Sequence, residues 1–430
     1  MVGGIDHWKR TRKTHGQTCA GLLRPESLAF KYGEYVKEGI MIKTLRVMLI
    51  PSNEQSTRLF QFAGTARFAY NWALEAEKKN HEAGNEFLSD CELRRLFTEL
   101  KQEEKYSWLY TISNNVTKQA IKDAVGAFAK FFNGLAKFPR YKCRRYDRPS
   151  FYVDSGKIKF TGTHVKLEGI AHSRRKNRQY ANWFRLAEHD RVPVNAKYFM
   201  PRVSFDGLNW YLTVGIECGN KVSEPKNDGE AFDVGVKVLA VGSSGQVYGN
   251  INNSKRVKQL KKRLRRLQRK VSRKYNKNKK GGRYRKTRNI IKSEKQLLKL
   301  SHQLTNIRTN YIHQVTTEIV KREPSFIVLE DLNVSGMMKN KHLARAIQEQ
   351  KLAEFYRIMQ YKCEWNGIKF ITADRFYASS KTCSRCGNVK RDLKLSDRTY
   401  HCEHCGAVID RDFNASVNLY NYGKKLIINH

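Results

Sequence analysis

The sequence predicts a multidomain α+β protein, in which a small β-barrel interrupted by helices precedes an α/β domain with a cysteine-rich insert. A chain of 430 residues is too long for one ordinary core, so several domains are expected. Its content of 40% hydrophobic and 11% aromatic residues is enough to bury real cores, which argues against a disordered chain. The spacing of apolar residues changes along the chain between alternation and helical periodicity, which indicates both strands and helices.

The first half of the chain has the pattern of a strand, a helical insert and further strands. An alternating segment over residues 42–50 ends at a Pro-Ser-Asn turn. Helical spacing follows over 54–135 and is clearest at 116–132. Strand patterns return over 136–225, with a hairpin about the Asp206-Gly207 turn. A small β-barrel interrupted by helices is therefore expected.

The second half predicts an α/β domain. Antiparallel strands come first, then two amphipathic helices, a continuous apolar strand of the kind buried in parallel sheets, a long helix and a further strand. These elements are expected at residues 231–241, 260–271, 300–319, 326–330, 342–366 and 369–372.

Three acidic residues stand where apolar elements end. Asp233 lies inside a predicted strand, Glu330 ends the continuous apolar strand, and Asp412 directly precedes a short predicted helix beginning near Asn414. The order of elements suits the RNase H-like fold, in which the first and fourth strands lie side by side, and this pairing would bring Asp233 next to Glu330. Clustered carboxylates repel one another unless a cation neutralises them, and Mg²⁺ is the cation that carboxylates and phosphate oxygens share.

Each acid also has an ordinary explanation. An aspartate in a strand is often an edge residue, Glu330-Asp331 could be a solvated strand end, and Asp410 with Asp412 could pair with Arg411. Their combination in this element order favours a catalytic site. Two Mg²⁺ ions ~3.5–4 Å apart can activate a water and stabilise the leaving oxygen of a phosphodiester.

The cysteines predict a structural zinc site. Nine are present, and an odd number argues for reduced thiols with a metal site rather than a disulfide framework. The last four form two C-x2-C pairs, each followed by a glycine that favours a turn, and four thiolates make a closed tetrahedral Zn²⁺ site. Two disulfides and a catalytic zinc are the disfavoured alternatives. The ligands are Cys383, Cys386, Cys402 and Cys405.

Net charge predicts a polyanionic partner. Lysine and arginine number 82 against 40 acidic residues, a formal charge of +42, and such a chain repels itself unless it binds nucleic acid or a membrane surface. No apolar run of about 18 residues is present to span a bilayer, and no signal peptide is visible, so nucleic acid is favoured and a membrane is not expected.

Two basic segments are the predicted nucleic-acid contacts. Residues 255–292 contain 20 lysines and arginines and no acidic residue, whereas an ordinary solvated helix face carries both signs. Tyr275 and Tyr284 could stack on bases there. A second basic segment, 137–148, interleaves tyrosines. The predicted phosphate-binding residues are Arg140, Lys142, Arg144, Arg145, Lys255, Arg256, Lys262, Arg263, Arg266, Arg269, Lys270, Arg273 and Lys274.

Four motifs together resemble the TnpB family, the insertion-sequence OrfB proteins related to the compact type V CRISPR effectors. They are Asp233-Val-Gly-Val-Lys237, Leu329-Glu-Asp-Leu-Asn-Val334, Ser379-Ser-Lys-Thr-Cys-Ser-Arg-Cys-Gly387 and Asp410-Arg-Asp-Phe-Asn-Ala415. The resemblance extends from about Met41 to the C-terminus. It implies a transposon-encoded, Mg²⁺-dependent, RNA-guided DNA endonuclease, with Asp233, Glu330 and Asp412 as the metal-binding catalytic residues. Asp412 is preferred to Asp410 because the second aspartate of this motif is catalytic in relatives.

The resemblance also implies an architecture and partners. Expected are an N-terminal extension (1–40) without a known counterpart, a wedge β-barrel (41–60 and 136–225), a helical recognition insert (61–135), a RuvC nuclease domain (226–375 and 409–430) and a zinc-ribbon target-nucleic-acid-binding insert (376–408). The implied partners are a guide RNA from the element end and double-stranded target DNA. A monomer in the cytoplasm of a prokaryote, associated with the nucleoid, is expected.

Two other classes of function stay open on the sequence. One is a nuclease-inactive repressor that binds DNA through its guide, which is expected to have lost an acidic residue of the site. The other is a strand-transfer transposase, suggested by the link to mobile elements, although no second catalytic constellation is visible in the sequence.

Overall fold

The computed structural model describes residues 40–169, 181–219, 224–394 and 397–428. The chain divides into two compact units, Met1–Gly219 and Asn220–His430. The expected N-terminal extension lies outside the described residues, except for Ile40, where the first strand begins.

The first unit contains a seven-stranded antiparallel sheet in the order β2-β6-β7-β1-β5-β4-β3. The predicted hairpin is confirmed, since Val203 pairs with Leu212 across the turn at Asp206-Gly207. Burial alternates along much of β7, as expected for a strand with one face on a core. The strands are β1 (Ile40–Ile50), β2 (Ser150–Tyr152), β3 (Lys159–Phe160), β4 (His164–Lys166), β5 (Trp183–Leu186), β6 (Tyr198–Phe205) and β7 (Trp210–Gly219).

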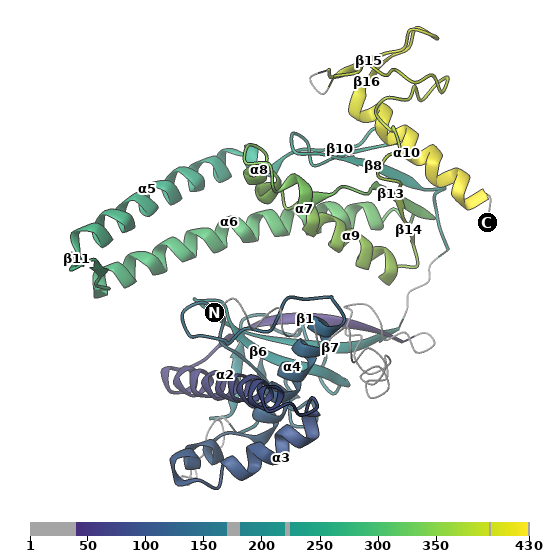
Figure 1. Ribbon diagram of the computed structural model, residues 1–430. Coiled ribbons are helices and arrows are strands. Elements are labelled where there is room, and N and C mark those ends of the chain that lie inside the picture. Colours follow the sequence, from purple (N-terminus) through teal and green to yellow (C-terminus); the bar gives the residue numbers. More distant parts are fainter. Residues whose placement is uncertain (1–39, 170–180, 220–223, 395–396, 429–430) are drawn as a thin grey trace. The chain divides into compact units, whose positions relative to one another are not determined.

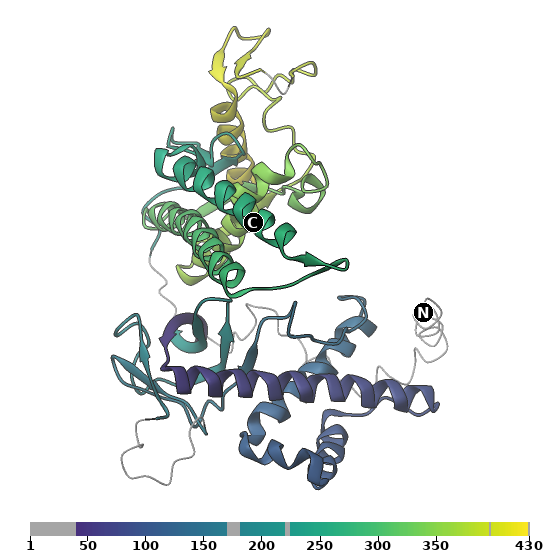
Figure 2. The same ribbon diagram turned by 90° about the vertical axis from the view of Figure 1, so that its left-hand side faces the viewer.

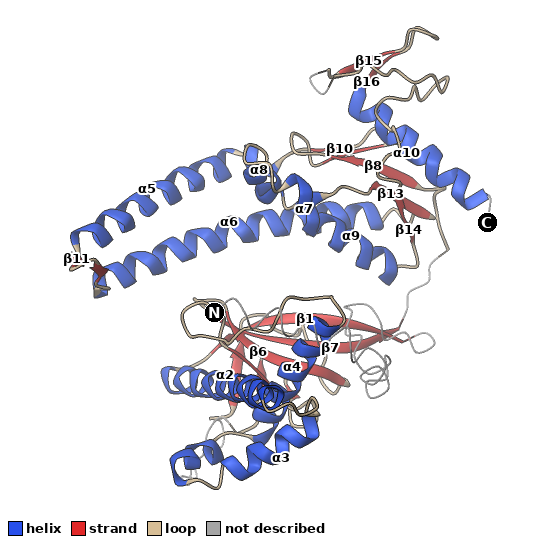
Figure 3. Cartoon of the chain, viewed as in Figure 1, coloured by secondary structure: helices blue, strands red, loops and turns tan. Residues whose placement is uncertain are grey.

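The predicted helical insert consists of α2 (Asn53–Glu82), α3 (Asp90–Leu100), the 3-10 helix η3 (Glu104–Thr111) and α4 (Asn114–Phe132). Ser52 and Ser89 begin α2 and α3 with capping boxes, in which the serine hydroxyl accepts from a backbone N–H and the third helical residue bonds back. Helices α2 and α3 lie together on one side of the sheet (Figure 3), and one hydrophobic core joins the helices and the strands. The insert is thus packed as part of the sheet's own domain.

Glu77 of α2 is buried in this core with one carboxylate oxygen unsatisfied among the described residues. Burial raises its pKa to about 7, so the folded state favours the protonated form and its stability falls as the pH rises from 4.5 to 7. Glu77→Gln removes this dependence. Hydrogen exchange of α2 amides in the full chain measures the free energy of unfolding of this helix. Between pH 5 and pH 8 that free energy should increase in the variant by on the order of 1–3 kcal/mol relative to the wild type.

Glu82→Gln is the control for this comparison, because Glu82 lies on the same helix with its side chain largely exposed. Its difference from the wild type should be nearly constant across the same pH range. A Glu77→Gln difference that is equally constant would show that Glu77 is ionised without cost in the folded protein.

The second unit is built on a mixed five-stranded sheet in the order β10-β9-β8-β13-β14. Strands β8 and β13 pair in parallel, as do β13 and β14, whereas β8, β9 and β10 are antiparallel. The expected pairing of the strand that carries Asp233 with the strand that carries Glu330 is therefore confirmed. The strands are β8 (Glu230–Val234), β9 (Ala240–Gly242), β10 (Val247–Tyr248), β13 (Phe326–Glu330) and β14 (Lys369–Ala373).

Helices cover both faces of this sheet (Figure 1). Apolar residues of α6 (Arg288–Val320) and α9 (Leu352–Trp365) share one core with Phe232 and Leu329. Leu419 of α10 (Arg411–Ile428) belongs to a second core on the opposite face. Gly423 allows this close packing, because a Cβ there would lie 2.4 Å from Cγ2 of Val328. The predicted α/β layering is present, with α10 against the central strands.

Two helix predictions were wrong in detail. The single helix expected over 342–366 is broken into α8 (Ala344–Gln350) and α9, because Lys351 has a left-handed backbone (φ 57°) that no residue preference of lysine signals. Its ammonium group contacts Thr309 and Glu354, which hold it in place. The short helix expected after Asp412 is instead α10, which begins at Arg411 and extends for 18 residues.

Helices α5 (Lys255–Lys277) and α6 form a long antiparallel hairpin with the strands β11 (Lys279–Lys280) and β12 (Arg283–Tyr284) at its tip (Figures 1 and 2). The remaining described elements of this unit are η5 (Ile251–Asn253), α7 (Val334–Met337), β15 (Thr399–His401) and β16 (Val408–Asp410). None of the described helices combines the length and apolarity needed to span a membrane.

Candidate functional site

The register of the central strands brings Asp233 and Glu330 to the same position of the sheet. Leu329 is the partner of Phe232 in the parallel pair β8–β13, and the two acids are the next residue on each strand. Phe232 and Leu329 point into the core beneath α6 and α9. Because side chains alternate along a strand, Asp233 and Glu330 point to the opposite face, where α10 lies.

Asp412 comes to this face in the first turn of α10. The neighbouring Asp410 has a different role, since its carboxylate accepts a hydrogen bond from the backbone N–H of Phe413 at 3.0 Å and so caps the helix. Asp412 is left with a long ion pair to Arg398 at 3.9 Å. The two aspartates thus have different roles: Asp410 caps the helix, and the geometry favours Asp412 as the one that faces the strands.

The three carboxylates interact electrostatically. The pKa of Asp233 is raised to about 8, first by burial and then by the negative charges of Glu330 and Asp412, against an opposing effect of Arg411. A cluster that disfavours its own ionisation in this way is suited to a divalent cation, which would reverse the balance of charge.

The acidic group is more widely spaced than the cysteine cluster. Among the described residues, the four cysteines are the one group of three or more His, Cys, Asp or Glu placed closely enough to hold a single metal ion, and their ligand atoms all lie within 4.8 Å of one another. Wider spacing suits a pair of ions, because ligands on either side of two cations ~3.5–4 Å apart need not approach one another closely. It also suits carboxylates that repel one another in the absence of a cation.

Two residues at this site were missed by the sequence reasoning. Ser379 is buried and its hydroxyl donates a hydrogen bond to Glu330. It lies in the motif Ser379–Gly387, in which only the cysteines were predicted to have a function.

Tyr356 of α9 has a buried hydroxyl without a hydrogen-bond partner among the described residues. Burial and the charges of Glu330, Asp233 and Asp331 raise the pKa of Tyr356, so it stays protonated and can donate. The sequence did not predict this donor, because a tyrosine in an amphipathic helix is usually an ordinary packing residue.

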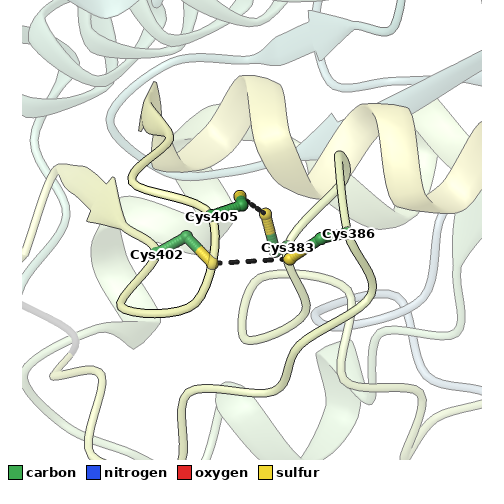
Figure 4. Close-up of side chains that lie close together, drawn as sticks. All are labelled: Cys383, Cys386, Cys402 and Cys405. Carbon is green, nitrogen blue, oxygen red and sulfur yellow. Dashed lines mark hydrogen bonds between the residues drawn. The ribbon is translucent and has the colours of Figure 1, made fainter.

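The four predicted cysteines form a cluster at the end of α10 that carries Asp412 (Figure 4). They come from two turns, in which Gly387 (φ 77°) and Gly406 (φ 67°) adopt the left-handed backbone that glycine tolerates. Backbone N–H groups of Cys405 and His404 lower the pKa of Cys402, which favours the thiolate. The predicted turns and their convergence are confirmed.

The sulfur spacing fits a tetrahedral metal site. The Sγ atoms of Cys383 and Cys405 are 3.7 Å apart and those of Cys386 and Cys402 3.5 Å apart. A tetrahedron with metal–sulfur bonds of ~2.3 Å has edges of about 3.8 Å, whereas a disulfide bond is about 2.05 Å long. All four thiols are free, so the donor set fits a structural Zn²⁺ and the disulfide alternative is not what the structure contains.

The outer face of α5 is almost entirely cationic. Arg265, Arg269 and Arg273 follow one another at four-residue spacing and line a shallow groove with Gln268 and Ser272. Among the described residues, Lys261 is the α5 cation that pairs with a carboxylate, that of Glu349. The predicted contact residues of α5 that lie exposed are Lys255, Arg256, Lys262, Arg263, Arg266, Arg269, Lys270 and Arg273. Arg265 is a further exposed residue of this face that the sequence reasoning did not name.

Three predicted contact residues are engaged within the protein. Lys274 joins α5 to α6, because its ammonium group donates to Ser293 at 2.8 Å. Lys142 places its ammonium group 3.5 Å from the centroid of the Tyr70 ring. Arg140 forms an ion pair with Asp147 at 2.8 Å. Arg144 and Arg145 lie exposed in a turn.

Of the two tyrosines in the basic hairpin, one is engaged within the protein and the other is exposed. Tyr275 donates a hydrogen bond to Glu294 at 2.6 Å, and its ring meets the Tyr284 ring edge-on. Tyr284 itself is 57% exposed at the hairpin tip. Tyr284 therefore has a ring face open for stacking, whereas Tyr275 links the two helices.

Comparison with known proteins shows which family the chain resembles. Residues 216–341 match the OrfB_IS605 family model, described as "Probable transposase", and residues 353–419 match the Cas12f1-like TNB domain. A protein of Streptomyces pristinaespiralis named "Putative RNA-guided DNA endonuclease" is 29% identical over 89% of each chain. The chain is thus similar to the TnpB (OrfB_IS605) proteins over most of its length.

A second relative and a third domain match extend this similarity. "Putative RNA-guided DNA endonuclease InsQ" of Escherichia coli K12 is 27% identical, over 90% of this chain and 93% of its own. Residues 41–86 match a family model described as a helix-turn-helix domain. In this chain the matched span is a strand followed by a helix, β1 and α2.

A solved structure aligns with nearly the whole chain. The cryo-EM structure of the Cas12f1–sgRNA–target DNA complex has a TM-score of 0.49 and 13% sequence identity, over 89% of this chain and 99% of that one.

Proposed function

We propose that this protein is a transposon-encoded, RNA-guided DNA endonuclease whose phosphodiester-cleaving site is formed by Asp233, Glu330 and Asp412. The observation that carries the proposal is the parallel register of β8 and β13, which sets two carboxylates side by side, together with their charge interaction with Asp412. The relatives named as RNA-guided DNA endonucleases support the same function.

The domain assignment follows from this proposal. The sheet with α6, α9 and α10 corresponds to an RNase H-like (RuvC) domain over 226–375 and 409–430, with the four-cysteine segment 376–408 as its zinc-ribbon insert. The seven-stranded sheet corresponds to the wedge domain, over 41–60 and 136–225, and residues 61–135 to the recognition insert. The shared core of sheet and insert favours their acting as one body.

Each acidic residue has a role in the proposed reaction. Asp233 and Glu330 hold their carboxylates on rigid neighbouring strands, and Asp412 adds a third on the first turn of α10. Bound Mg²⁺ would activate a water and stabilise the leaving oxygen of the phosphodiester. The protonated hydroxyl of Tyr356 on α9 lies within electrostatic reach of Glu330 and Asp233 and is available as a hydrogen-bond donor. The guide reads the target sequence by base pairing, so the protein need bind only backbone and a short flanking motif.

The arginine stripe of α5 is proposed to bind phosphates. The triple variant Arg265→Gln, Arg269→Gln, Arg273→Gln should bind RNA more weakly, because each neutralised phosphate releases a counterion. The slope of log affinity against log salt concentration is negative, and its magnitude should fall by roughly 0.7–0.9 for each phosphate that is no longer neutralised, a total of about 2–3 for three arginines. Fluorescence titration of the full-length protein with its guide RNA at several salt concentrations measures this slope.

Lys286→Gln is the matched control, since Lys286 lies in the same basic segment but pairs with Glu294 at 2.6 Å. It should change the slope little. A triple variant with the wild-type slope would place the RNA on another surface.

The function itself is tested by mixing the purified protein, the RNA that copurifies with it, and a DNA duplex matching that RNA, in the presence of Mg²⁺. Guided cleavage of the duplex is the expected result. RNA-dependent binding without cutting would favour the repressor, and covalently joined strands would favour the transposase.

A further inference from the structure

Glu330 is held by a residue from outside the central sheet. The hydroxyl of Ser379 donates a hydrogen bond to Oε1 of Glu330 across 49 positions of sequence. Ser379 is 3% exposed, so water does not compete for this bond. A glutamate at the end of a strand would otherwise sample several rotamers, at an entropic cost on metal binding.

A serine is well suited to orient a metal-binding carboxylate. Its neutral hydroxyl occupies one lone pair of Oε1 and leaves Oε2 for a cation, whereas a lysine or arginine in its place would cancel the negative charge that the cation needs. Hydrogen-bonded partners of this kind fix the direction in which a ligand faces its metal.

Ser379 is itself fixed by α10. The side-chain amide of Asn418, 4% exposed, donates to the backbone carbonyl oxygens of Ser379 at 2.8 Å and Thr382 at 2.6 Å. These two hydrogen bonds tie the segment that supplies the hydroxyl to the helix that carries Asp412.

The same segment leads directly into the cysteine cluster. Asn414, fully buried two residues after Asp412, donates to the carbonyl oxygen of Thr382 at 2.7 Å and accepts from the backbone N–H of Ser384 at 2.9 Å. Thr382 and Ser384 are the two neighbours of Cys383. One continuous hydrogen-bonded chain thus joins the first cysteine turn, the start of α10 and Glu330.

We propose that Ser379 is a positioning residue for Glu330, and that the segment from Ser379 to Ser384 transmits the order of the cysteine cluster to the acidic site. This inference rests on the proposed nuclease function and deepens it. The cysteine site, when it holds its metal, fixes the turn at Cys383; Asn414 and Asn418 fix that turn against α10; and Ser379 then fixes the carboxylate of Glu330.

Ser379→Ala tests the first link. Loss of a partner that orients a metal ligand typically weakens metal binding 10–100-fold, so the Mn²⁺ concentration that half-saturates the full-length protein with its guide RNA should rise by about that factor. Electron paramagnetic resonance of free Mn²⁺ measures this without reference to cleavage. Guided DNA binding and zinc content should be unchanged, because the cysteines are intact.

Three further variants separate positioning from mere packing. Ser379→Thr keeps the hydroxyl and should restore Mn²⁺ affinity. Ser379→Cys keeps a side chain of similar size with a weaker donor and should give an intermediate Mn²⁺ affinity. This variant tests the hydrogen bond even if the alanine variant does not fold. Ser380→Ala, a partly buried neighbour, should bind Mn²⁺ like the wild type.

Wild-type Mn²⁺ affinity in both Ser379→Ala and Ser379→Cys would overturn the inference while leaving the proposed function intact. A different result would overturn the proposed function itself: in that case Asp233→Asn would bind Mn²⁺ as the wild type does. The second link is tested by Cys402→Ser, which should lower zinc content and weaken Mn²⁺ binding together. Zinc loss with unchanged Mn²⁺ binding would overturn the transmission from the cysteine cluster.

Discussion

Glu330→Gln is expected to reduce the rate of target cleavage by roughly 10³-fold or more, with guided DNA binding retained. The amide has nearly the shape of the carboxylate and can still accept from Ser379, so the fold should persist. It lacks the charge that the proposed site uses to hold its cations. Single-turnover cleavage by the protein–RNA complex and equilibrium binding of the same DNA measure the two effects separately.

Asp331→Asn is the matched control for this variant. Asp331 is the next residue in the chain, has a side chain that is 45% exposed and pairs with Arg375 at 2.6 Å. An exposed ion pair contributes little to stability, so this variant should cut at nearly the wild-type rate. If Glu330→Gln also cut at that rate, Glu330 would have no part in catalysis.

Cys383→Ser is expected to have the largest effect on folding. A closed four-thiolate site contributes on the order of 10 kcal/mol to the free energy of folding when zinc is bound. Cys383 is buried with Tyr400 and Cys402 in the small core of the four-cysteine segment. Zinc content should fall from about one ion per chain to nearly none, and amides of residues 383–410 should lose hydrogen-exchange protection. Cleavage should fall with it.

Cys91→Ser makes the same chemical change at an exposed cysteine on α3. It should leave zinc content and the protection of the insert at wild-type values. A Cys383→Ser protein that kept its zinc and its protection would mean that the cluster is not a structural metal site.

The sequence was most informative where one physical signal dominates. The continuous apolar run Phe326–Glu330 became a strand with those same bounds, because a segment buried on both faces has little freedom of conformation. The two cysteine pairs converge as predicted, since each spacing defines a turn. The adjacency of Asp233 and Glu330 was expected from the element order, which suits a fold whose first and fourth strands lie side by side, and the parallel register of β8 and β13 confirms it.

Features that depend on distant contacts were not predictable in this way. The break at Lys351 is stabilised by Thr309, 42 positions earlier in the chain, and lysine has no local preference that announces it. The hydrogen bond from Ser379 to Glu330 spans 49 positions and exists only after the insert has docked on α10. Lys142 and Lys274 look like phosphate ligands in a basic run, but the structure engages each with a neighbouring helix or ring.

The proposed cleavage activity requires the three carboxylates to form one divalent-cation site. Anomalous scattering from Mn²⁺ soaked into crystals of the protein–RNA complex tests this directly. Peaks within about 2.0–2.3 Å of carboxylate oxygens of Asp233, Glu330 and Asp412 are predicted, and they should vanish in Asp233→Asn. Mn²⁺ bound only at other acidic residues, with none of these three as a ligand, would contradict the account.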